Sequence, residues 1–241
     1  MQTRYLVCPS PRFTHAMGLN FELANAIGVQ CVWLRHALPL SRAKATVVDP
    51  QNLKMIVVDV SSQARHPEAF LYGTIKALDA SGIYFRIDDD ELLTEDHLLY
   101  FGRYHCLEDF FLHKSIPRKW VNLAGYSSNL FGEDPQFRIC NLKYSSEDKN
   151  IHTPGFKVKL IKKPLKLDAI LHLSWLMESF ADRRDKLALY NTIREGAGSD
   201  FEKWYLPENY SDDEHLWKVL SFSEYARFVE WKKRVGQLSG S

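Results

Sequence analysis

The amino-acid sequence predicts an α/β fold, with a Rossmann-like, mixed and mainly parallel sheet flanked by helices and a helical C-terminal region. Two observations lead to this expectation. Short apolar segments alternate with segments of helical periodicity through residues 1–92, which is typical of parallel strands joined by right-handed helical crossovers. The chain of 241 residues, 45% hydrophobic and 25% charged, is also long enough to bury a full core.

The first half supplies four strands and two helices. We expect strands at residues 4–8, 29–34, 54–60 and 83–88 to be parallel neighbours, because their connections are too long for hairpins. The third, Lys-Met-Ile-Val-Val-Asp-Val, is nearly all apolar, as in a strand buried on both faces. Helices are expected at residues 13–27 and 67–80. Their predicted inner faces are Met17, Phe21, Leu23 and Ala24 in the first, and Phe70, Leu71, Ile75 and Leu78 in the second.

The pattern changes after residue 91. We expect a helix at residues 95–114, followed by short strands at 119–126, 137–144, 156–161 and 169–173. Ser174 is predicted to cap a helix that runs to about residue 194 and ends at Gly196 and Gly198. Residues 211–214 have capping-box spacing and are expected to open the C-terminal helices. The inner face predicted there comprises Tyr225, Phe228, Val229 and Val235.

Composition excludes several classes of protein. A net charge of +1 argues against a dedicated nucleic-acid binder, which would carry a basic surplus. The four cysteines (Cys8, Cys31, Cys106 and Cys140) form no C-x-x-C pair and no zinc-site spacing, so we expect reduced thiols, mostly in strands. No signal peptide opens the sequence, and no segment approaches the roughly 18 apolar residues of a membrane span. These features predict a cytoplasmic protein, with peripheral contact at the inner face of a membrane as the remaining option.

The most informative segment is Gly82-Ile-Tyr-Phe-Arg-Ile-Asp-Asp-Asp-Glu, in which an apolar strand runs directly into four carboxylates. Four acids at the end of a buried strand cannot all be ionised without a cation. Asp88 and Asp90 are two positions apart, so they project to the same side and can converge on one hard metal ion, Mg²⁺ or Mn²⁺. The alternative is a solvated acidic turn that only ends the strand.

Other polar residues follow the neighbouring strands. Arg12 comes shortly after the first strand and its Pro9, and Asp59 lies at the end of the third. Ligands bind at the carboxyl ends of strands in open α/β sheets, so these residues and the acid cluster predict a nucleotide-type site.

This order of elements resembles the glycosyltransferases of the GT-A fold, particularly the large family two. The likeness covers roughly residues 3–190 and rests on Val-Val-Asp-Val-Ser, then Tyr-Phe-Arg-Ile-Asp-Asp-Asp-Glu-Leu-Leu, then Ile-Leu-His-Leu-Ser-Trp around His172. It implies one domain over residues 1–241, with a nucleotide-sugar half at 1–92, an acceptor half at 93–195, and C-terminal helices and a tail at 196–241. No Gln-x-x-Arg-Trp element is present, which argues against a processive polymerase.

The resemblance also implies roles for individual residues. Asp88 and Asp90 correspond to the Asp-x-Asp pair that holds Mn²⁺ or Mg²⁺ on the donor diphosphate, with Asp89 and Glu91 supporting them or capping the strand. His172 corresponds to a distal histidine that returns to the metal or the phosphates. A histidine in an apolar strand, taken alone, is more often a hydrogen-bonded core residue, and the acid cluster is what brings the ligand role level with that reading. Asp59 corresponds to the strand-end aspartate near the base or ribose, or it simply forms a turn. Pro9 and Arg12 would line the base pocket.

The expected reaction is transfer of a sugar from a nucleotide-sugar, UDP-linked by preference, to a saccharide or glycolipid acceptor. In inverting enzymes of this kind a carboxylate takes the proton of the attacking hydroxyl. Glu133 or Asp134 is the first candidate for that base, and Glu108 or Asp109 the second; all four read equally as solvated acids. Two other functions stay open: a phosphoryl or nucleotidyl transferase that uses the same metal, and a non-catalytic module that binds glycans or nucleotides.

Two basic clusters bear on possible partners. One lies beside His172 and the other beside Trp231; their members are Lys157, Lys159, Lys162, Lys163 and Lys166, and residues 232–234. The first cluster reads as a lysine-protected edge strand, or as a contact with donor phosphates or a lipid diphosphate. The second reads as a solvated helix end, or as a contact with an anionic membrane surface.

Overall fold

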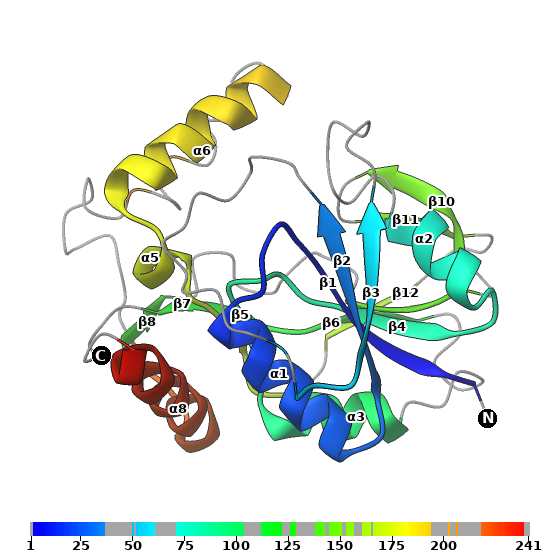
Figure 1. The fold of residues 1–241 in the computed structure, drawn as a ribbon, viewed down its shortest axis with the longest axis horizontal. Helices are drawn as coiled ribbons and strands as arrows, with labels where there is room; N and C mark the ends of the chain where they lie inside the picture. Colours follow the sequence, from blue (N-terminus) through cyan, green and yellow to red (C-terminus); the bar gives the residue numbers. More distant parts are fainter. Residues whose placement is uncertain are drawn as a thin grey trace.

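The fold is α/β, as a computed structural model of the chain shows (Figure 1). The model describes residues 2–36, 50, 52–60, 71–103, 112–121, 126–128, 138–142, 145–150, 153–156, 161–164, 166–193, 202, 206 and 218–238. These residues form two five-stranded sheets, two small two-stranded sheets and the helices around them.

The first sheet is mostly parallel and has the strand order β3-β2-β1-β4-β9. Its parallel members are β1 (Arg4–Ser10), β2 (Gln30–His36), β3 (Met55–Val60) and β4 (Ile83–Arg86). The last strand, β9 (Ile139–Asn141), pairs with β4 in the antiparallel direction. The prediction of four parallel neighbours is therefore confirmed, and the carboxyl ends of β1 and β4 lie side by side.

Helices cover both faces of this sheet (Figure 1). On one face, α1 (His15–Ala26) and α3 (Glu95–Arg103) pack on alternate residues of β1 and β4, such as Leu6 and Phe85. On the other face, Ile75 of α2 (Leu71–Leu78) joins the core under β1 and β2. Leu78 was expected to face inward as well, but it is 39% exposed.

Helix α1 begins and ends at residues with clear local signals. The side chain of Thr14 caps the helix by accepting a hydrogen bond from the Met17 N–H. At the other end, Gly28 adopts a φ of +75°, which a residue without Cβ tolerates, and Val29 donates its N–H back to the Ala24 carbonyl. The helix is thereby fixed between β1 and β2 with its N-terminus at the carboxyl edge of the sheet.

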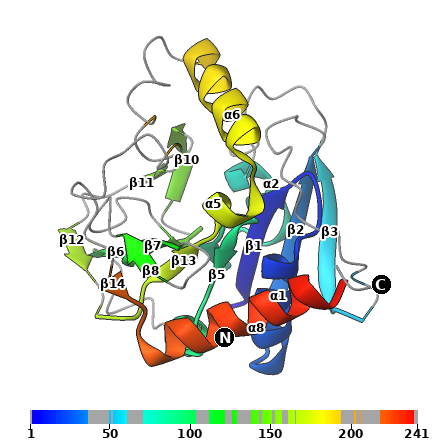
Figure 2. The same cartoon turned by 90° about the vertical axis from the view of Figure 1, so that its left-hand side faces the viewer.

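The second sheet has the order β14-β8-β7-β13-β5. Its strands are β5 (Glu91–Leu92), β7 (Arg118–Val121), β8 (Tyr126–Ser128), β13 (Ile170–His172) and β14 (Lys218–Val219). The C-terminal helix α8 (Phe222–Leu238) packs Phe228 and Trp231 against this sheet and against the side of α1 that faces away from the first sheet (Figure 2). Because β5 directly follows the loop after β4, the two sheets meet at the acid cluster.

Short strands complete the described structure. β6 (Leu112–Ser115) pairs in parallel with β12 (Ile161–Pro164), and β10 (Ser145–Asn150) pairs antiparallel with β11 (Thr153–Phe156). The helix expected at residues 95–114 is therefore too long, since α3 ends at Arg103 and residues 112–115 are extended. The strand predicted at 119–126 is two strands, β7 and β8, separated by residues outside the described part.

Two expectations about burial also need correction. Strand β3 is the last strand at its end of the described sheet, and its Ile56 and Val57 are 37% and 42% exposed, so its apolar run does not mark burial on both faces. In α8, Tyr225 was expected on the inner face but is 49% exposed, while Trp231 takes the buried position. The expectation for the cysteines holds for Cys8, Cys31 and Cys140, which are free and buried in strands; Cys106 lies outside the described residues.

The helix expected from Ser174 to about residue 194 is interrupted. It divides into α5 (Ser174–Met177) and α6 (Phe180–Ile193) at Glu178 and Ser179. Ser174 is the first residue of α5 rather than its cap, and the true capping box is at Ser179, whose side chain and N–H exchange hydrogen bonds with Asp182. The break turns the Glu178 side chain inward, where it is 8% exposed.

The C-terminal helix also starts at a capping box that the sequence analysis did not identify. The Ser221 N–H donates to Glu224, and the Glu224 N–H donates to the Ser221 hydroxyl. Glu224 further accepts hydrogen bonds from Lys119 of β7 and from the Ala169 N–H. This buried carboxylate therefore joins α8 to the second sheet; residues 211–214 lie outside the described part.

A buried histidine anchors the start of α3. His97 Nδ1 accepts a hydrogen bond from the Thr94 N–H, so Nε2 carries the proton and donates to the Asp168 carbonyl at 2.7 Å. Both ring nitrogens are satisfied only in the neutral form. Burial accordingly lowers the pKa of His97 to about 4.

We expect this histidine to make the fold sensitive to acid. Its pKa is lower in the folded than in the unfolded chain, so the unfolded state binds the extra proton first as the pH falls. The stabilisation is complete above pH 6.5 and is lost between pH 6.5 and about 4, at a cost of about 3 kcal/mol. Urea unfolding of wild type and His97→Gln at several pH values measures this, and an equal pH slope for both proteins would contradict it.

Candidate functional site

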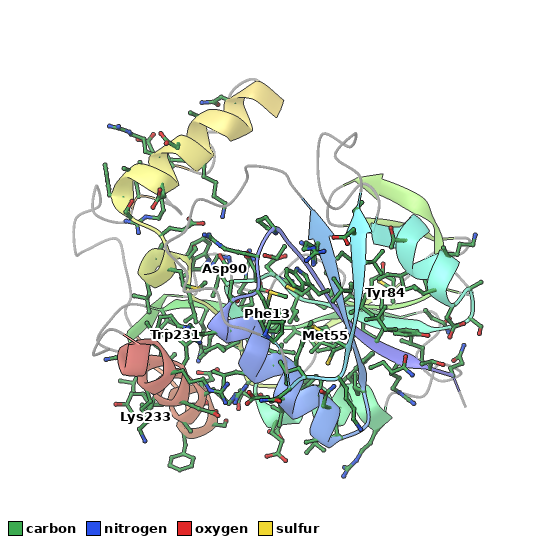
Figure 3. The ribbon with its side chains drawn as sticks, viewed as in Figure 1. Phe13, Met55, Tyr84, Asp90, Trp231 and Lys233 are labelled. Carbon is green, nitrogen blue, oxygen red and sulfur yellow. The ribbon has the colours of Figure 1, made fainter. Side chains whose placement is uncertain are left out.

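The acid cluster lies where the two sheets meet. Residues 88–90 follow β4 after the single residue Ile87. Glu91 opens β5, which pairs antiparallel with β13 in the register Glu91 opposite His172. This pairing brings His172 to the acid cluster from about 80 residues further along the chain. Asp90 lies close to α5, on the side of the molecule from which α6 extends (Figure 3).

Glu91 is neutralised by arginines. Its two carboxylate oxygens receive a bidentate pair of hydrogen bonds from Arg138, at 2.8 and 3.0 Å, and Arg118 lies 3.6 Å away. Glu91 also accepts the N–H of Asp88 at 2.9 Å, which closes the turn after β4. The side chains of Glu91 and Arg138 are fully buried. Glu91 is thus a structural residue that holds the turn, as its expected capping role implied.

Asp88 also has arginine partners. Arg86 donates to its carboxylate at 2.6 Å, and Arg138 lies 3.9 Å from the second oxygen. Four adjacent buried acids are expected to need a cation, and for Asp88 and Glu91 arginine side chains supply it. Both carboxylate oxygens of Asp88 thus lie near an arginine. Asp88 remains a candidate metal ligand only if the metal shares one of these oxygens with Arg86 or Arg138.

Asp89 connects the acid cluster to the first strand and helix. Its carboxylate accepts a hydrogen bond from Ser10 at the end of β1, and its carbonyl accepts one from Thr14, the cap of α1. Burial raises the pKa of Asp89, although the Ser10 hydrogen bond works in the opposite direction. These bonds fix the position of the whole turn relative to α1.

Asp90 differs from its neighbours because its charge is poorly compensated. Its Oδ1 lies 3.6 Å from Nε2 of His172, and no hydrogen bond to its carboxylate is found among the described residues. Burial raises the pKa of Asp90 well above its usual range; Lys186 opposes this rise, and the charges of Asp89, Asp88 and Glu178 add to it. A buried carboxylate surrounded by others is a favourable place for an added cation.

His172 is held rigidly and is neutral. Its ring stacks on Trp120 with centroids 4.0 Å apart, and Nδ1 lies 3.1 Å from the Ser174 hydroxyl. Burial, helped by the charges of Arg118 and Lys186, lowers the pKa of His172 well below its usual value. The Ser174 N–H donates to Nδ1 at 3.5 Å, which places the ring proton on Nε2, toward Asp90. Metals bind the neutral imidazole, and Nε2 becomes available as a ligand when this proton moves to Nδ1, where the Ser174 hydroxyl can accept its hydrogen bond.

Two charged residues near Asp90 were not predicted from the sequence. They are Glu178, which precedes α6, and Lys186, which lies on α6. Glu178 is 92% buried; its Oε1 lies 3.4 Å from Lys186 Nζ, and its Oε2 has no hydrogen-bond partner in the described part of the chain. Both residues act electrostatically on Asp90. A carboxylate six residues after His172 and a lysine on the second turn of the next helix were the available signals.

The remaining predicted residues are more dispersed. Pro9 is buried near the end of β1, and Arg12 is half-buried just beyond it. Asp59 lies at the end of β3, three strands from β4 or roughly 14 Å at the usual strand spacing. It is exposed and forms an ion pair with Arg35 of β2. Asp59 thus lies on the predicted edge of the sheet but not in the acid cluster.

Several predicted residues lie outside the described part of the chain. They are the first-choice base candidates Glu133 and Asp134, the second-choice candidates Glu108 and Asp109, and two residues of the first lysine cluster, Lys157 and Lys159. Of the rest of that cluster, Lys162 and Lys163 belong to β12, and Lys166 is exposed. Their predicted roles remain predictions.

The donor set can be compared with the needs of a divalent cation. Among the described residues no group of three His, Cys, Asp or Glu side chains is placed to hold a metal. Asp90 and His172 nevertheless offer one carboxylate oxygen and one imidazole nitrogen at 3.6 Å, with little competing hydrogen bonding. Mg²⁺ and Mn²⁺ sites that handle phosphates commonly use one or two protein groups and take the other ligands from water and substrate. The residues fit a metal of that kind.

The sequence matches no model of a known protein family and no curated protein. The site is therefore interpreted from its own geometry. A buried acid and a neutral histidine face each other at the carboxyl edge of a parallel sheet, with Lys186 and several arginines close by. Such a set of groups can bind a cation together with a phosphorylated ligand.

Proposed function

We propose that this chain is a metal-dependent glycosyltransferase that moves a sugar from a nucleotide-sugar, UDP-linked by preference, to a saccharide or glycolipid acceptor. The observation that carries the proposal is the 3.6 Å approach of Asp90 and His172. The resemblance to GT-A glycosyltransferases predicts that the Asp-x-Asp segment and the distal histidine share one metal site, and these two residues lie about 80 positions apart in the sequence. If the acidic turn and the histidine had unrelated structural roles, nothing would require them to lie close together at the end of a strand.

The position of the pair in the sheet supports the same function. The parallel order β3-β2-β1-β4 gives a continuous carboxyl edge from Asp59 to the acid cluster. An elongated nucleotide-sugar lying along this edge would place its base near β2 and β3 and its diphosphate near Asp90. Pro9 and Arg12, at the end of β1, lie between these two positions.

Each group then has a defined task. Asp90 and His172 would hold Mn²⁺ or Mg²⁺, and Asp88 and Asp89 support the turn that presents Asp90. A bound divalent cation neutralises the charge that develops on the leaving nucleoside diphosphate. Lys186 and Arg12 supply fixed positive charge for the phosphate oxygens, which stabilises the same charge without a proton transfer.

Glu178 is the described residue best suited to take the proton of the acceptor hydroxyl. Its Oε2 has no hydrogen-bond partner among the described residues, and its charge acts on Asp90. Lys186 Nζ lies 3.4 Å from the other oxygen and holds the carboxylate in place, and a general base must be positioned within hydrogen-bond reach of the proton that it takes. Glu178 joins Glu133 and Asp134 as a candidate for this role.

A ligand panel tests the proposed function. We expect UDP with Mn²⁺ to raise the melting temperature by several degrees at saturating concentration, and UDP alone, GDP, CMP or ATP to do so much less. Slow Mn²⁺-dependent hydrolysis of a UDP-sugar should accompany this. Stabilisation by ATP with release of its phosphate would instead indicate a phosphoryl or nucleotidyl transferase. Binding without any turnover would indicate a non-catalytic module.

The same assay separates binding from proton transfer. Glu178→Gln keeps the size of the side chain and should lower kcat by about 10²-fold or more, with the UDP and Mn²⁺ thermal shift unchanged. Glu202→Gln is a matched control at an exposed position and should leave both readouts unchanged. Full activity of the Glu178 variant would return the base assignment to Glu133 or Asp134.

A further inference from the structure

The outer face of α8 is a surface that the proposed reaction does not use. The three most exposed large hydrophobic side chains of the described residues lie within seven positions at the start of this helix. They are Val219 at the end of β14, just before the helix, and Phe222 and Tyr225 in its first turn, which are 72%, 91% and 49% exposed. Large apolar side chains scattered singly on a surface need no explanation, but such a cluster marks an interaction site.

The rest of the outer face continues this pattern. At 100° per residue, the positions on the same side of the helix as Phe222 fall within an arc of about 120°. They are Tyr225, Ala226, Val229, Lys232, Lys233 and Gly236. Trp231 points into the molecule, whereas Lys233 lies on the outer side (Figure 3). The outer face is therefore aromatic in its first turns and basic in its last, with no carboxylate on it.

The acidic residues of the helix are engaged elsewhere. Glu224 is buried against Lys119, and Glu230 lies at the edge of the face in an ion pair with Arg227. Arg234, which the sequence analysis grouped with the lysines, turns inward to Glu22 of α1. The net charge of the outer face is thus positive, although the whole chain is nearly neutral.

We propose that the outer face of α8 binds an anionic lipid surface, with the helix lying parallel to the membrane plane. No helix among the described residues is long and apolar enough to cross a membrane. A helix of 17 residues, about 25 Å long, with aromatic side chains and lysines on one face instead suits the headgroup region. Phe222 and Tyr225 enter the boundary of the acyl chains, and Lys233 pairs with lipid phosphates.

The charge on this face selects the membrane over an apolar protein partner. A protein interface core is depleted in lysine, because burying an ammonium group is costly. Lysines beside aromatic groups keep their charge at a lipid headgroup while their stems cover apolar surface. Both ribbon views place α8 at the periphery of the molecule (Figures 1 and 2), and Phe222 is 91% exposed there.

Co-sedimentation of the full chain with vesicles tests this proposal. We expect binding to phosphatidylcholine vesicles that contain phosphatidylserine, and much weaker binding to phosphatidylcholine alone. Phe222→Ser should lower the partition coefficient by about tenfold. Lys233→Glu should lower it by about tenfold or more at low salt, with a smaller effect at high salt.

Two matched controls make the same chemical changes elsewhere. Phe180→Ser alters another exposed aromatic residue, at the start of α6, and Lys54→Glu another exposed lysine, before β3. Neither should change vesicle binding. Failure of the wild type to sediment with anionic vesicles, or equal binding by Phe222→Ser, would overturn the proposal. So would a wild-type dimer that Phe222→Ser dissociates without lipid, since the face would then serve a second copy of the chain.

Discussion

Replacing Asp90 with asparagine is expected to reduce Mn²⁺-dependent transfer by about 10²- to 10³-fold, which is the typical effect of removing one group that stabilises the charged transition state. The amide keeps the shape of the side chain but cannot balance a divalent cation. UDP binding should weaken in the presence of Mn²⁺ and stay the same in its absence. Initial rates and thermal shifts with and without the metal measure these effects.

The same variant should not lower the stability of the fold. The Asp90 carboxylate is buried, its pKa is raised by burial, and the described residues give it no hydrogen bond. Removing an uncompensated charge from such a site costs nothing and usually stabilises. Asp96→Asn, at an exposed position in the first turn of α3, is the control and should change neither activity nor stability. A clear loss of stability in the Asp90 variant would show that Asp90 is a structural residue.

Glu91→Ala is expected to have the opposite outcome, a loss of about 3–5 kcal/mol in the free energy of unfolding. The substitution leaves the fully buried Arg138 without its bidentate partner and Arg118 without its neighbour at 3.6 Å. It also removes the acceptor for the Asp88 N–H, so the turn after β4 loses its closing bond. Urea unfolding at neutral pH measures the difference.

An exposed ion pair provides the comparison for that result. Glu22 and Arg234 also form a bidentate pair, but their side chains are 44% and 32% exposed. Glu22→Ala should therefore cost less than about 1 kcal/mol. Glu91→Gln, which retains two polar atoms, should fall between the two. If Glu91→Ala costs no more than Glu22→Ala, Glu91 does not stabilise the turn.

The parallel sheet was predictable because its signals are local. Each of the first four strands is a short apolar run separated from the next by a segment long enough to cross over, and handedness rules then restrict the topology. The same reasoning failed where a boundary depends on distant partners. Residues 112–115 carry no mark of being extended until β12 pairs with them, and Ile56 and Val57 are exposed because β3 has a partner only in β2 among the described strands.

The same contrast between local signals and distant contacts applies to the candidate site. The acid cluster and His172 could be identified from residue type and position, since carboxylates at a strand end and a histidine in an apolar strand are both unusual. Their neighbours could not. Arg138 and Arg118 reach Glu91 only through the pairing of β9 with β4 and of β13 with β7. Lys186 and Glu178 come near Asp90 because the helix predicted from residue 174 to about 194 is interrupted at residues 178 and 179. The only sequence signal for this interruption is the capping box of Ser179 and Asp182.

The contacts of α8 have a consequence for the order in which the chain folds during synthesis. Arg227 donates to the Leu93 carbonyl and Arg234 pairs with Glu22, so the last helix closes on the first half of the chain. The parallel strands up to Arg86 can pair as soon as they leave the ribosome, but Phe222 follows only roughly ten seconds later at ordinary elongation rates. During this interval Leu19, and then Val121 and Leu171 once they emerge, lack the Phe228 and Trp231 side chains that pack with them in the finished fold. The nascent chain therefore passes through a stage at which binding by a chaperone would matter most.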